Sequence, residues 1–351
     1  MSSAIELARP EVRQLVPYSA ASYADGLVRL NANETPWPAP VSNADLNRYP
    51  PEKPELLTRQ LAEYYSMPPD GVLVTRGSSE AIDLLIRAFC AAGQDAIVTC
   101  PPTFGMYRVY ADVQGARVNE IPLRADQGYA LDADQITRNW PDDGKLLFIC
   151  SPNNPTGNRF DTDELNLICN LLGGRALVVI DAAYTEFADE DPTLELLEAN
   201  DNVVVLRTLS KAFGLAGARC GVLLGPADVV GMLSCIMPPY ALSTPCIDAV
   251  LACLGPDAQA EVQTRVELLR GERTRLAAAL EALSGIDTVY PSDANFLLVR
   301  AADAKRCCEL AKNGGVLIRN FGWEPGLEGC LRITVGTKDE NDRLLKSLAE
   351  L

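Results

Sequence analysis

The chain has 351 residues, which predicts two domains or one large domain with an appendage. Its 31 lysines and arginines stand against 47 acidic residues, and the resulting formal charge of −16 disfavours nucleic acids and anionic membranes as partners. The chain has no histidine, which excludes a Ser/His/Asp triad, a Cys/His dyad and every metal site that needs imidazole. We therefore expect no bound metal, and catalysis by other side chains.

The eleven cysteines are scattered between Cys90 and Cys330 without a C-x-x-C motif, and several lie in apolar, strand-like runs. This pattern predicts reduced, buried thiols of a cytoplasmic protein. The N-terminal sequence lacks the apolar core of a signal peptide, and no run approaches the roughly 18 apolar residues of a membrane span. We expect a soluble protein with no membrane partner.

The first 54 residues are rich in proline and asparagine, which interrupt both helices and strands, so we expect irregular structure there. Residues 1–45 are predicted to form an extended N-terminal arm. A long arm in a compact protein is usually functional or covers a neighbour. We expect this arm to pack partly on a small domain and partly on a partner subunit.

Short apolar runs alternate with helical segments over residues 46–235. Continuous apolar runs of this kind are typical of a mainly parallel sheet with helices on both faces. We therefore predict a large α/β domain here, with strands at residues 72–75, 96–100, 116–123, 145–151, 176–182, 202–208 and 220–225.

The pattern then changes to a long charged helical segment at 260–283, followed by shorter strands. This predicts a smaller α+β domain over residues 236–351. Its strands are expected at residues 287–291, 295–300, 316–320 and 331–336. In open parallel sheets ligands bind beyond the carboxyl ends of the strands, so the loops after those strands are the place to look for a site.

The first such loop has the sequence R-G-S-S-E. Gly77 permits a tight turn, and Ser78 and Ser79 stand at a helix N-terminus, where free N–H groups favour an anion such as phosphate. An ordinary helix cap with Glu80 in the first turn explains the same residues.

Polar residues follow two later strands as well. The strand at 145–151 runs into S-P-N-N-P-T-G, which exposes the amide of Asn154. The next strand ends at Asp181, with Tyr184 three residues later. A carboxylate at the end of a buried strand is unfavourable unless it meets a cation.

Lys211 emerges from the strand at 202–208 into a glycine-rich loop that leads to Arg219. Partial burial lowers the pKa of a lysine and makes it a nucleophilic amine. Taken with the preceding loops, the set supplies what pyridoxal phosphate requires: an amine for a Schiff base, a carboxylate for the ring nitrogen, partners for the ring hydroxyl and a cation with N–H groups for the phosphate.

Two arginines of the small domain, Arg319 and Arg332, are expected to lie at the ends of neighbouring strands. In a chain of charge −16, converging arginines suggest a pocket for an anion. A pair of surface salt bridges is the alternative.

At these residues the chain resembles the fold-type-I pyridoxal-phosphate aminotransferases, and among them the histidinol-phosphate aminotransferases. The match to the superfamily spans nearly the whole chain and lies in S-P-N-N-P-T-G, V-V-I-D-x2-Y and S-K-A-F-G-L-A-G-x-R. The narrower match lies in V-P-Y (16–18), L-N-A-N-E (30–34), N-R-Y-P (47–50), P-P-T-F-G-M-Y (101–107), L-I-R-N (317–320) and G-C-L-R-I-T-V-G-T (329–337).

The resemblance implies a role for each residue of the cofactor site. Lys211 would bind the cofactor covalently, Asp181 would pair with its ring nitrogen, and Asn154 and Tyr184 would bond its ring oxygen. Phe104 would stack on the ring, with a core phenylalanine as the alternative. The residues implied around the cofactor phosphate are Ser78, Ser79, Thr208, Ser210 and Arg219.

The resemblance also implies a homodimer with shared active sites, because Tyr49 of N-R-Y-P would reach the phosphate site of the partner subunit. Tyr18, Asn154, Arg319 and Arg332 would bind the substrate.

The implied reaction is amino transfer from L-histidinol phosphate to 2-oxoglutarate, which yields imidazole acetol phosphate and glutamate in L-histidine biosynthesis. Lys211, Asp181 and Tyr184 would be the catalytic residues. The motifs concern residues that would bind the cofactor and do not determine the substrate. An aromatic amino acid aminotransferase and a threonine-phosphate decarboxylase-like enzyme therefore remain alternatives. A nicotinamide dehydrogenase is disfavoured, since the glycine cluster 214–221 does not follow the dinucleotide fingerprint.

Overall fold

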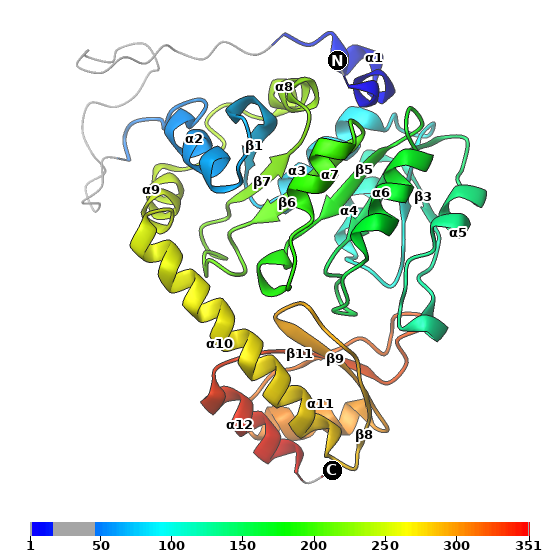
Figure 1. The fold of residues 1–351 in the computed structure, drawn as a ribbon, viewed down its shortest axis with the longest axis vertical. Coiled ribbons are helices and arrows are strands. Elements are labelled where there is room, and N and C mark those ends of the chain that lie inside the picture. Colours follow the sequence, from blue (N-terminus) through cyan, green and yellow to red (C-terminus); the bar gives the residue numbers. More distant parts are fainter. Residues whose placement is uncertain (1, 17–45, 350) are drawn as a thin grey trace.

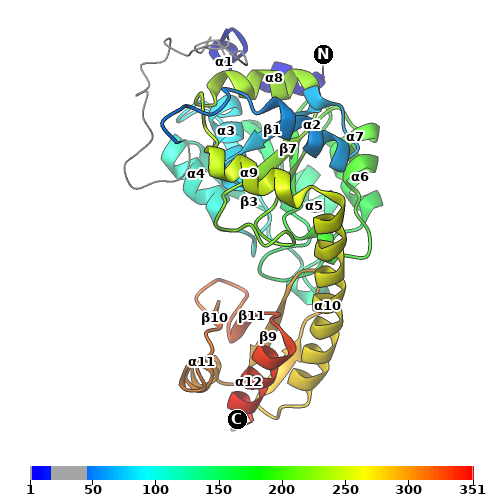
Figure 2. The same cartoon turned by 90° about the vertical axis from the view of Figure 1, so that its left-hand side faces the viewer.

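The computed structural model describes residues 2–16, 46–349 and 351. A larger body contains one sheet and a smaller body contains another, and the long helix α10 (Pro256–Glu281) runs from the first to the second (Figure 1). Figure 2 shows the same helix from the side, where it spans both bodies. Among the described residues, no helix combines the length and the apolar character needed to cross a bilayer.

The large sheet has seven strands in the order β1-β7-β6-β5-β4-β2-β3. All run parallel except β7, which is antiparallel to both of its neighbours. This confirms the predicted mainly parallel α/β sheet, and every strand predicted in this part of the chain is present. The strands are β1 (Val72–Thr75), β2 (Ala96–Thr99), β3 (Arg117–Glu120), β4 (Gly144–Cys150), β5 (Leu177–Asp181), β6 (Val203–Thr208) and β7 (Gly221–Leu224).

Helices cover both faces of this sheet, because successive side chains of a strand point to opposite faces. In β4, Leu147 and Ile149 enter one core while Leu146 and Phe148 enter the other. One core is closed by α2 (Glu55–Tyr64), α5 (Ala133–Arg138), α6 (Thr162–Leu171), α7 (Thr193–Ala199) and α9 (Thr244–Cys253). The other is closed by α3 (Ser78–Phe89), α4 (Met106–Gln114) and α8 (Ala227–Ile236).

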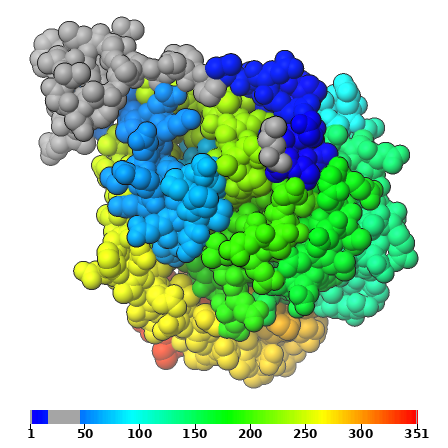
Figure 3. All heavy atoms as spheres, turned by 45° about the horizontal axis from the view of Figure 1, so that its top comes forward, coloured from blue at the N-terminus to red at the C-terminus, as the bar shows by residue number. Residues whose placement is uncertain are grey.

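The described start of the chain is more regular than the sequence predicts. It forms the short helices η1 (Ser3–Leu7) and α1 (Pro10–Arg13), which lie over α8 (Figure 3). Ala4 and Ile5 are buried in the adjacent core, and the Ser2 amide donates to Asp228 of α8 over 2.6 Å. These contacts anchor the segment to the large body. Pro10 does not prevent α1 from forming, because proline is tolerated in the first turn of a helix. Residues 17–45 of the predicted arm lie outside the described residues.

The smaller body has an antiparallel sheet in the order β10-β11-β9-β8. Its strands are β8 (Ile286–Val289), β9 (Phe296–Ala301), β10 (Arg319–Asn320) and β11 (Cys330–Thr334), and its helices include α11 (Ala304–Asn313) and α12 (Lys338–Leu348). The strand predicted over 316–320 is wrong in extent. Only its last two residues pair with β11, since this is the edge of the sheet and Leu317 is 85% exposed.

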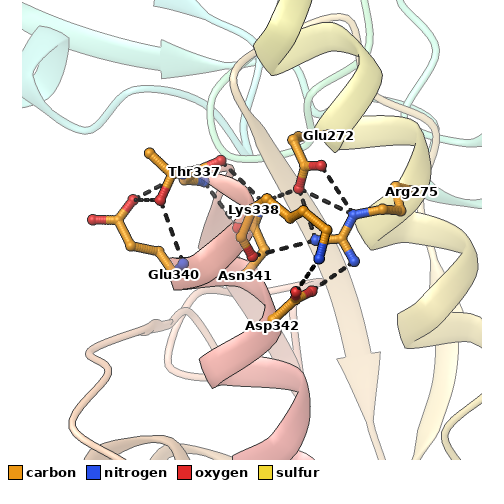
Figure 4. Close-up of polar contacts among 8 residues, drawn as sticks. Glu272, Arg275, Thr337, Lys338, Glu340, Asn341 and Asp342 are labelled. Carbon is orange, nitrogen blue, oxygen red and sulfur yellow. Dashed lines mark hydrogen bonds and ion pairs between the residues drawn. The ribbon is translucent and has the colours of Figure 1, made fainter.

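A polar network joins α12 to α10 (Figure 4). Arg275 forms ion pairs with Glu272 at 2.8 Å and with Asp342 at 2.7 Å, and the Asn341 amide donates to Glu272 over 2.9 Å. The C-terminal half of α10 is therefore part of the small body. Side chains of residues 242–254 instead join the core of the large sheet. We propose that the boundary between the domains, predicted at 235/236, lies within α10.

Over residues 46–349 there are also three short 3-10 helices, η2 (Pro69–Gly71), η3 (Ala125–Gln127) and η4 (Thr185–Phe187). All eleven cysteines are free, and most are buried.

Candidate active site

The carboxyl ends of β4, β5 and β6 bring the predicted polar residues to one edge of the large sheet. Cys150 of β4 pairs with Asp181 of β5, and Asp181 pairs with Leu206 of β6. The loop that carries Asn154 and the loop that carries Lys211 therefore start on either side of Asp181. Their proximity follows from strand order, because parallel strands end at the same edge.

Asp181 lies beneath this edge, 2% exposed. Its Oδ2 accepts a hydrogen bond from the Tyr107 hydroxyl over 2.8 Å, whereas its Oδ1 has no hydrogen-bond partner among the described residues. Burial raises the pKa of Asp181 to about 6, although the Tyr107 hydrogen bond, the nearby backbone N–H of Ala183 and the Lys211 charge oppose that rise. An unbonded, buried carboxylate oxygen is unfavourable and calls for a donor from a ligand.

Tyr107 is a site residue that the sequence reasoning missed. Its ring stacks on Phe148 of β4 at 4.7 Å and lies edge-on to Phe104 at 5.5 Å. Phe104 itself is partly buried and packs against the core that also contains Tyr107. The sequence feature that could have identified Tyr107 is its spacing of three residues from Phe104 where a helix begins, because residues three apart in a helical turn lie on one face.

The start of α3 lies against Arg219. Gly77, at φ +75°, caps the helix, and a Cβ at this position would come within 2.6 Å of Arg219 Nη2. A Cβ at Gly221 would lie 2.4 Å from the Ser78 amide nitrogen, so two glycines permit this close approach. The result is a helix N-terminus, with Ser78 and Ser79 in its first turn, that faces a guanidinium.

The neighbouring loop completes this group. Arg219 Nη1 donates to Ser210 Oγ at 3.2 Å, and the Ser210 amide donates to Thr208 Oγ1 at 3.2 Å. The Glu80 carboxylate accepts hydrogen bonds from the backbone N–H and the side-chain Nε–H of Arg76, both over 2.7 Å, and does not cap the helix. The first turn of α3 thus resembles an anion site more than a self-satisfied cap.

Asn154 and Tyr184 lie together with an arginine from the small body. The Asn154 amide donates to the Tyr184 hydroxyl over 3.4 Å, and Arg332 Nη1 donates to Asn154 Oδ1 over 2.5 Å. Tyr184 is buried and packs edge-on against Phe296 at 5.1 Å. The large and small bodies therefore share this part of the site.

Lys211 lies at the open side of the group, with its Nζ 5.4 Å from the centre of the Tyr184 ring. Desolvation lowers its pKa, and the nearby positive charge of Arg332 lowers it further, against the opposing effect of Asp181. The side chain is still accessible to solvent. A lysine in this setting has an increased fraction of neutral, nucleophilic amine.

Arg319 and Arg332 are cross-strand neighbours in β10 and β11. Within residues 46–349 neither arginine has a carboxylate within ion-pair distance, which favours a site for an anion over the alternative of two surface salt bridges. Two adjacent cations without counter-ions are typical of a site that binds an anion.

Two predicted site residues are not part of the group described above. Tyr49 is 50% exposed, and its ring stacks on Tyr240 of its own chain at 4.6 Å. It borders a surface hollow of about 430 Å³ with the start of α9. Tyr18 lies outside the described residues.

Known proteins resemble this chain in both sequence and fold. The family model "Aminotransferase class I and II" matches residues 28–348. A histidinol-phosphate aminotransferase of Yersinia pseudotuberculosis serotype O:1b (strain IP 31758) is 41% identical over 350 residues, which is 99% of this chain and 91% of the relative.

Two solved structures illustrate the likeness in fold. A putative aminotransferase from Burkholderia pseudomallei has a TM-score of 0.74 at 30% identity and covers 87% of this chain and 89% of its own. The histidinol-phosphate aminotransferase from Sinorhizobium meliloti, solved in complex with pyridoxal-5'-phosphate, has a TM-score of 0.78 at 24% identity, with 87% and 83% covered.

Proposed function

The chain belongs to the class I and II aminotransferase family and is a pyridoxal-phosphate-dependent enzyme, and we propose that it transfers the amino group of L-histidinol phosphate to 2-oxoglutarate. The products would be imidazole acetol phosphate and glutamate, in L-histidine biosynthesis. The observation that carries this proposal is a pair of arginines that has no counter-ion among the described residues and lies beside a site suited to the cofactor.

The residues of the sheet edge fit pyridoxal phosphate. The unbonded Oδ1 of Asp181 matches a protonated ring nitrogen, which needs an acceptor. Gly77 and Gly221 let the first turn of α3 lie close to Arg219, and this combination of a helix N-terminus and a cation suits a phosphate group. Asn154 and Tyr184 would bond the ring oxygen and Phe104 would cover the ring, while Ser78, Ser79, Thr208, Ser210 and Arg219 would hold the phosphate.

When bound, pyridoxal phosphate supplies an electron sink for the negative charge left at the substrate Cα. Lys211 would hold the cofactor covalently and, once the substrate amine has displaced it, act as the base; its lowered pKa favours the neutral amine that this role needs. Its Nζ would take the proton from Cα. Asp181 would keep the ring nitrogen protonated, and the Tyr107 hydroxyl, which donates to Asp181, would hold that carboxylate in place.

Substrate recognition would fall to the arginines. Arg332 reaches into the large body through its hydrogen bond to Asn154, and Arg319 lies beside it on the adjacent strand. A phosphate in one half-reaction and a carboxylate of glutamate in the other would meet the same cations. We propose Tyr18, outside the described residues, as a further contact.

The test is a parallel assay of the holoenzyme with histidinol phosphate, histidinol, phenylalanine and threonine phosphate. We expect amino transfer from histidinol phosphate to be preferred. Arg319→Ala should reduce kcat/KM for histidinol phosphate about 30-fold or more and spare histidinol, because a lost contact to a buried anion costs roughly 2–5 kcal/mol. Arg332→Ala should impair both histidinol phosphate and glutamate.

Other outcomes point to the alternatives. A wild type that is indifferent to the phosphate, or equal losses for both substrates in Arg319→Ala, would indicate an aromatic aminotransferase. Release of CO2 from threonine phosphate would indicate a decarboxylase.

We further propose a cytoplasmic homodimer in which Tyr49 serves the partner subunit's site. The free cysteines support the first part of this proposal, because persistent disulfides are rare in the cytosol. The exposure of Tyr49 beside a surface hollow supports the second.

A further inference from the structure

Phe321 lies against both arginines of the candidate substrate site. Its ring centre is 5.6 Å from the guanidinium carbon of Arg319 and 5.3 Å from that of Arg332. Both distances lie within the range of a cation–π interaction. One aromatic side chain therefore contacts the two cations that the proposed function assigns to the substrate anion.

The backbone fixes this ring relative to the sheet. The Phe321 amide donates to the Cys330 carbonyl over 2.9 Å, which continues the pairing of β10 with β11. The Phe321 carbonyl accepts from the Glu324 amide over 2.8 Å, and the Trp323 ring stacks on Phe321 at 6.0 Å. The ring position is thus set by the edge of the sheet and by the turn that follows.

An aromatic ring can hold two arginines without neutralising them. Like charges directly opposite each other across two strands repel, and Arg319 and Arg332 are such a pair. A carboxylate in the place of Phe321 would relieve the repulsion but would also compete with an incoming anion. The negative face of a ring attracts cations and leaves their full charge available for that anion.

The two arginines depend on Phe321 to different degrees. Arg332 also contacts Phe296, 5.3 Å from its ring centre, and donates to Asn154. For Arg319, the contact with Phe321 is the one side-chain interaction found among the described residues. Loss of the ring should therefore release Arg319 and leave Arg332 largely in place.

We propose that Phe321 is a positioning residue that orients Arg319 toward the phosphate of the substrate and so sets the preference for a phosphorylated amine. This inference rests on the proposed function. It predicts a defect in recognition of the phosphate group and not in the chemistry at Cα, because the ring contacts of Phe321 among the described residues are with Trp323, Arg319 and Arg332 and do not include Lys211 or Asp181.

The experiment compares Phe321→Leu with Phe321→Tyr, which keeps the ring, and with Leu317→Ala, an exposed change two residues before Arg319. We expect Phe321→Leu to raise KM for histidinol phosphate roughly two- to fivefold with little change in kcat, since Arg319 is exposed and a cation–π contact at an exposed site changes affinity by about that factor. Phe321→Leu should keep near-wild-type activity with histidinol. The control variants Phe321→Tyr and Leu317→Ala should keep near-wild-type activity with both substrates.

A binding measurement gives a readout that does not depend on turnover. Isothermal titration of the holoenzymes with inorganic phosphate should show roughly two- to fivefold weaker binding to Phe321→Leu, and unchanged binding to Phe321→Tyr and Leu317→Ala. If Phe321→Leu folds poorly, Phe321→Met offers the same loss of the ring with a longer side chain.

The outcomes separate the two proposals. If the wild type prefers histidinol phosphate and the aliphatic variants keep that preference and the phosphate affinity, Phe321 has no positioning role. Equal loss with histidinol and histidinol phosphate would mean a merely structural role and would also overturn the inference. If the wild type itself ignores the phosphate, the proposed function fails first.

Discussion

Asp181 is unfavourably placed in the isolated protein and, in our proposal, essential in the working enzyme. Its carboxyl group is buried with one oxygen unbonded, and this burial raises its pKa to about 6. The arrangement makes sense if a positively charged donor is bound in the active state. Stability and activity should therefore respond in opposite directions to a change at Asp181.

We expect Asp181→Asn to stabilise the cofactor-free protein at neutral pH. The folded-state pKa of Asp181 lies above its unfolded value, so the folded protein holds the proton more tightly and loses stability as the pH rises from about 4 to about 6. Above pH 6 the variant should be more stable by roughly 3 kcal/mol, a difference that vanishes near pH 4. Chemical denaturation of the two apoproteins from pH 4 to pH 8 measures this.

The same substitution should slow turnover by several orders of magnitude, because the charge that holds the ring-nitrogen proton is lost. Wild-type kcat in Asp181→Asn would make Asp181 a structural carboxylate.

Lys211→Ala should give a folded protein that binds the cofactor without a covalent bond and loses nearly all turnover, because nucleophile and base disappear together. Borohydride reduction of the wild type, followed by peptide mapping, should find the cofactor on Lys211. A label on Lys145 or another lysine would overturn the assignment.

At the scale of elements, Arg207 ties β6 to the turn that carries Tyr184. Arg207 is 3% exposed and bonds Glu186 of η4 at 2.7 Å and Asp191 at 2.5 Å, while its guanidinium carbon lies 5.0 Å from the centre of the Tyr65 ring. Glu186 follows Tyr184 by two residues, and β6 leads to Lys211. This ion-pair network fixes the turn that carries Tyr184 relative to the strand that leads to Lys211.

Arg207→Met should lower the free energy of unfolding by about 3–5 kcal/mol, because it leaves the buried carboxylate of Glu186 without its cation. The double variant Arg207→Met/Glu186→Gln should recover part of that loss, since no buried charge remains unpaired. Denaturation curves of the three proteins test the idea. A single variant as stable as wild type would show that the network contributes nothing measurable.

At the scale of the whole molecule, the site is assembled from two bodies and, in our proposal, from two chains. Arg332 of the small sheet bonds Asn154 of the large body, so closure of the site requires both. Tyr49 stacks on Tyr240 at the surface of its own chain, next to the start of α9. Such exposed aromatic pairs suit an interface between subunits.

Mixing of inactive Lys211→Ala subunits with impaired Tyr49→Phe subunits should restore activity. After dissociation and reassociation, one site of each heterodimer carries both lesions and the other carries neither. Activity above that of either parent would support a shared site. No gain, with subunit exchange shown by mass spectrometry, would mean that Tyr49 acts within its own chain or not at all.

Much of this protein could be predicted from local sequence. The strands of the large sheet are apolar runs whose periodicity needs no knowledge of their neighbours, and the residues at their ends, Asn154, Asp181 and Lys211, stand where a parallel sheet must gather them. Helix α10 begins at Pro256, slightly before its predicted start, because proline suits the first helical turn.

Tertiary structure alone decided the contacts between residues that are far apart in the chain. Tyr107 meets Asp181 only because α4 packs on the face of the sheet behind β5, and no local pattern encodes that distance. The short β10 depends on having a single partner strand, and the placement of Phe321 between two arginines depends on the register of that pair. Local periodicity determines which segments become strands and helices, whereas strand order and packing determine which side chains meet.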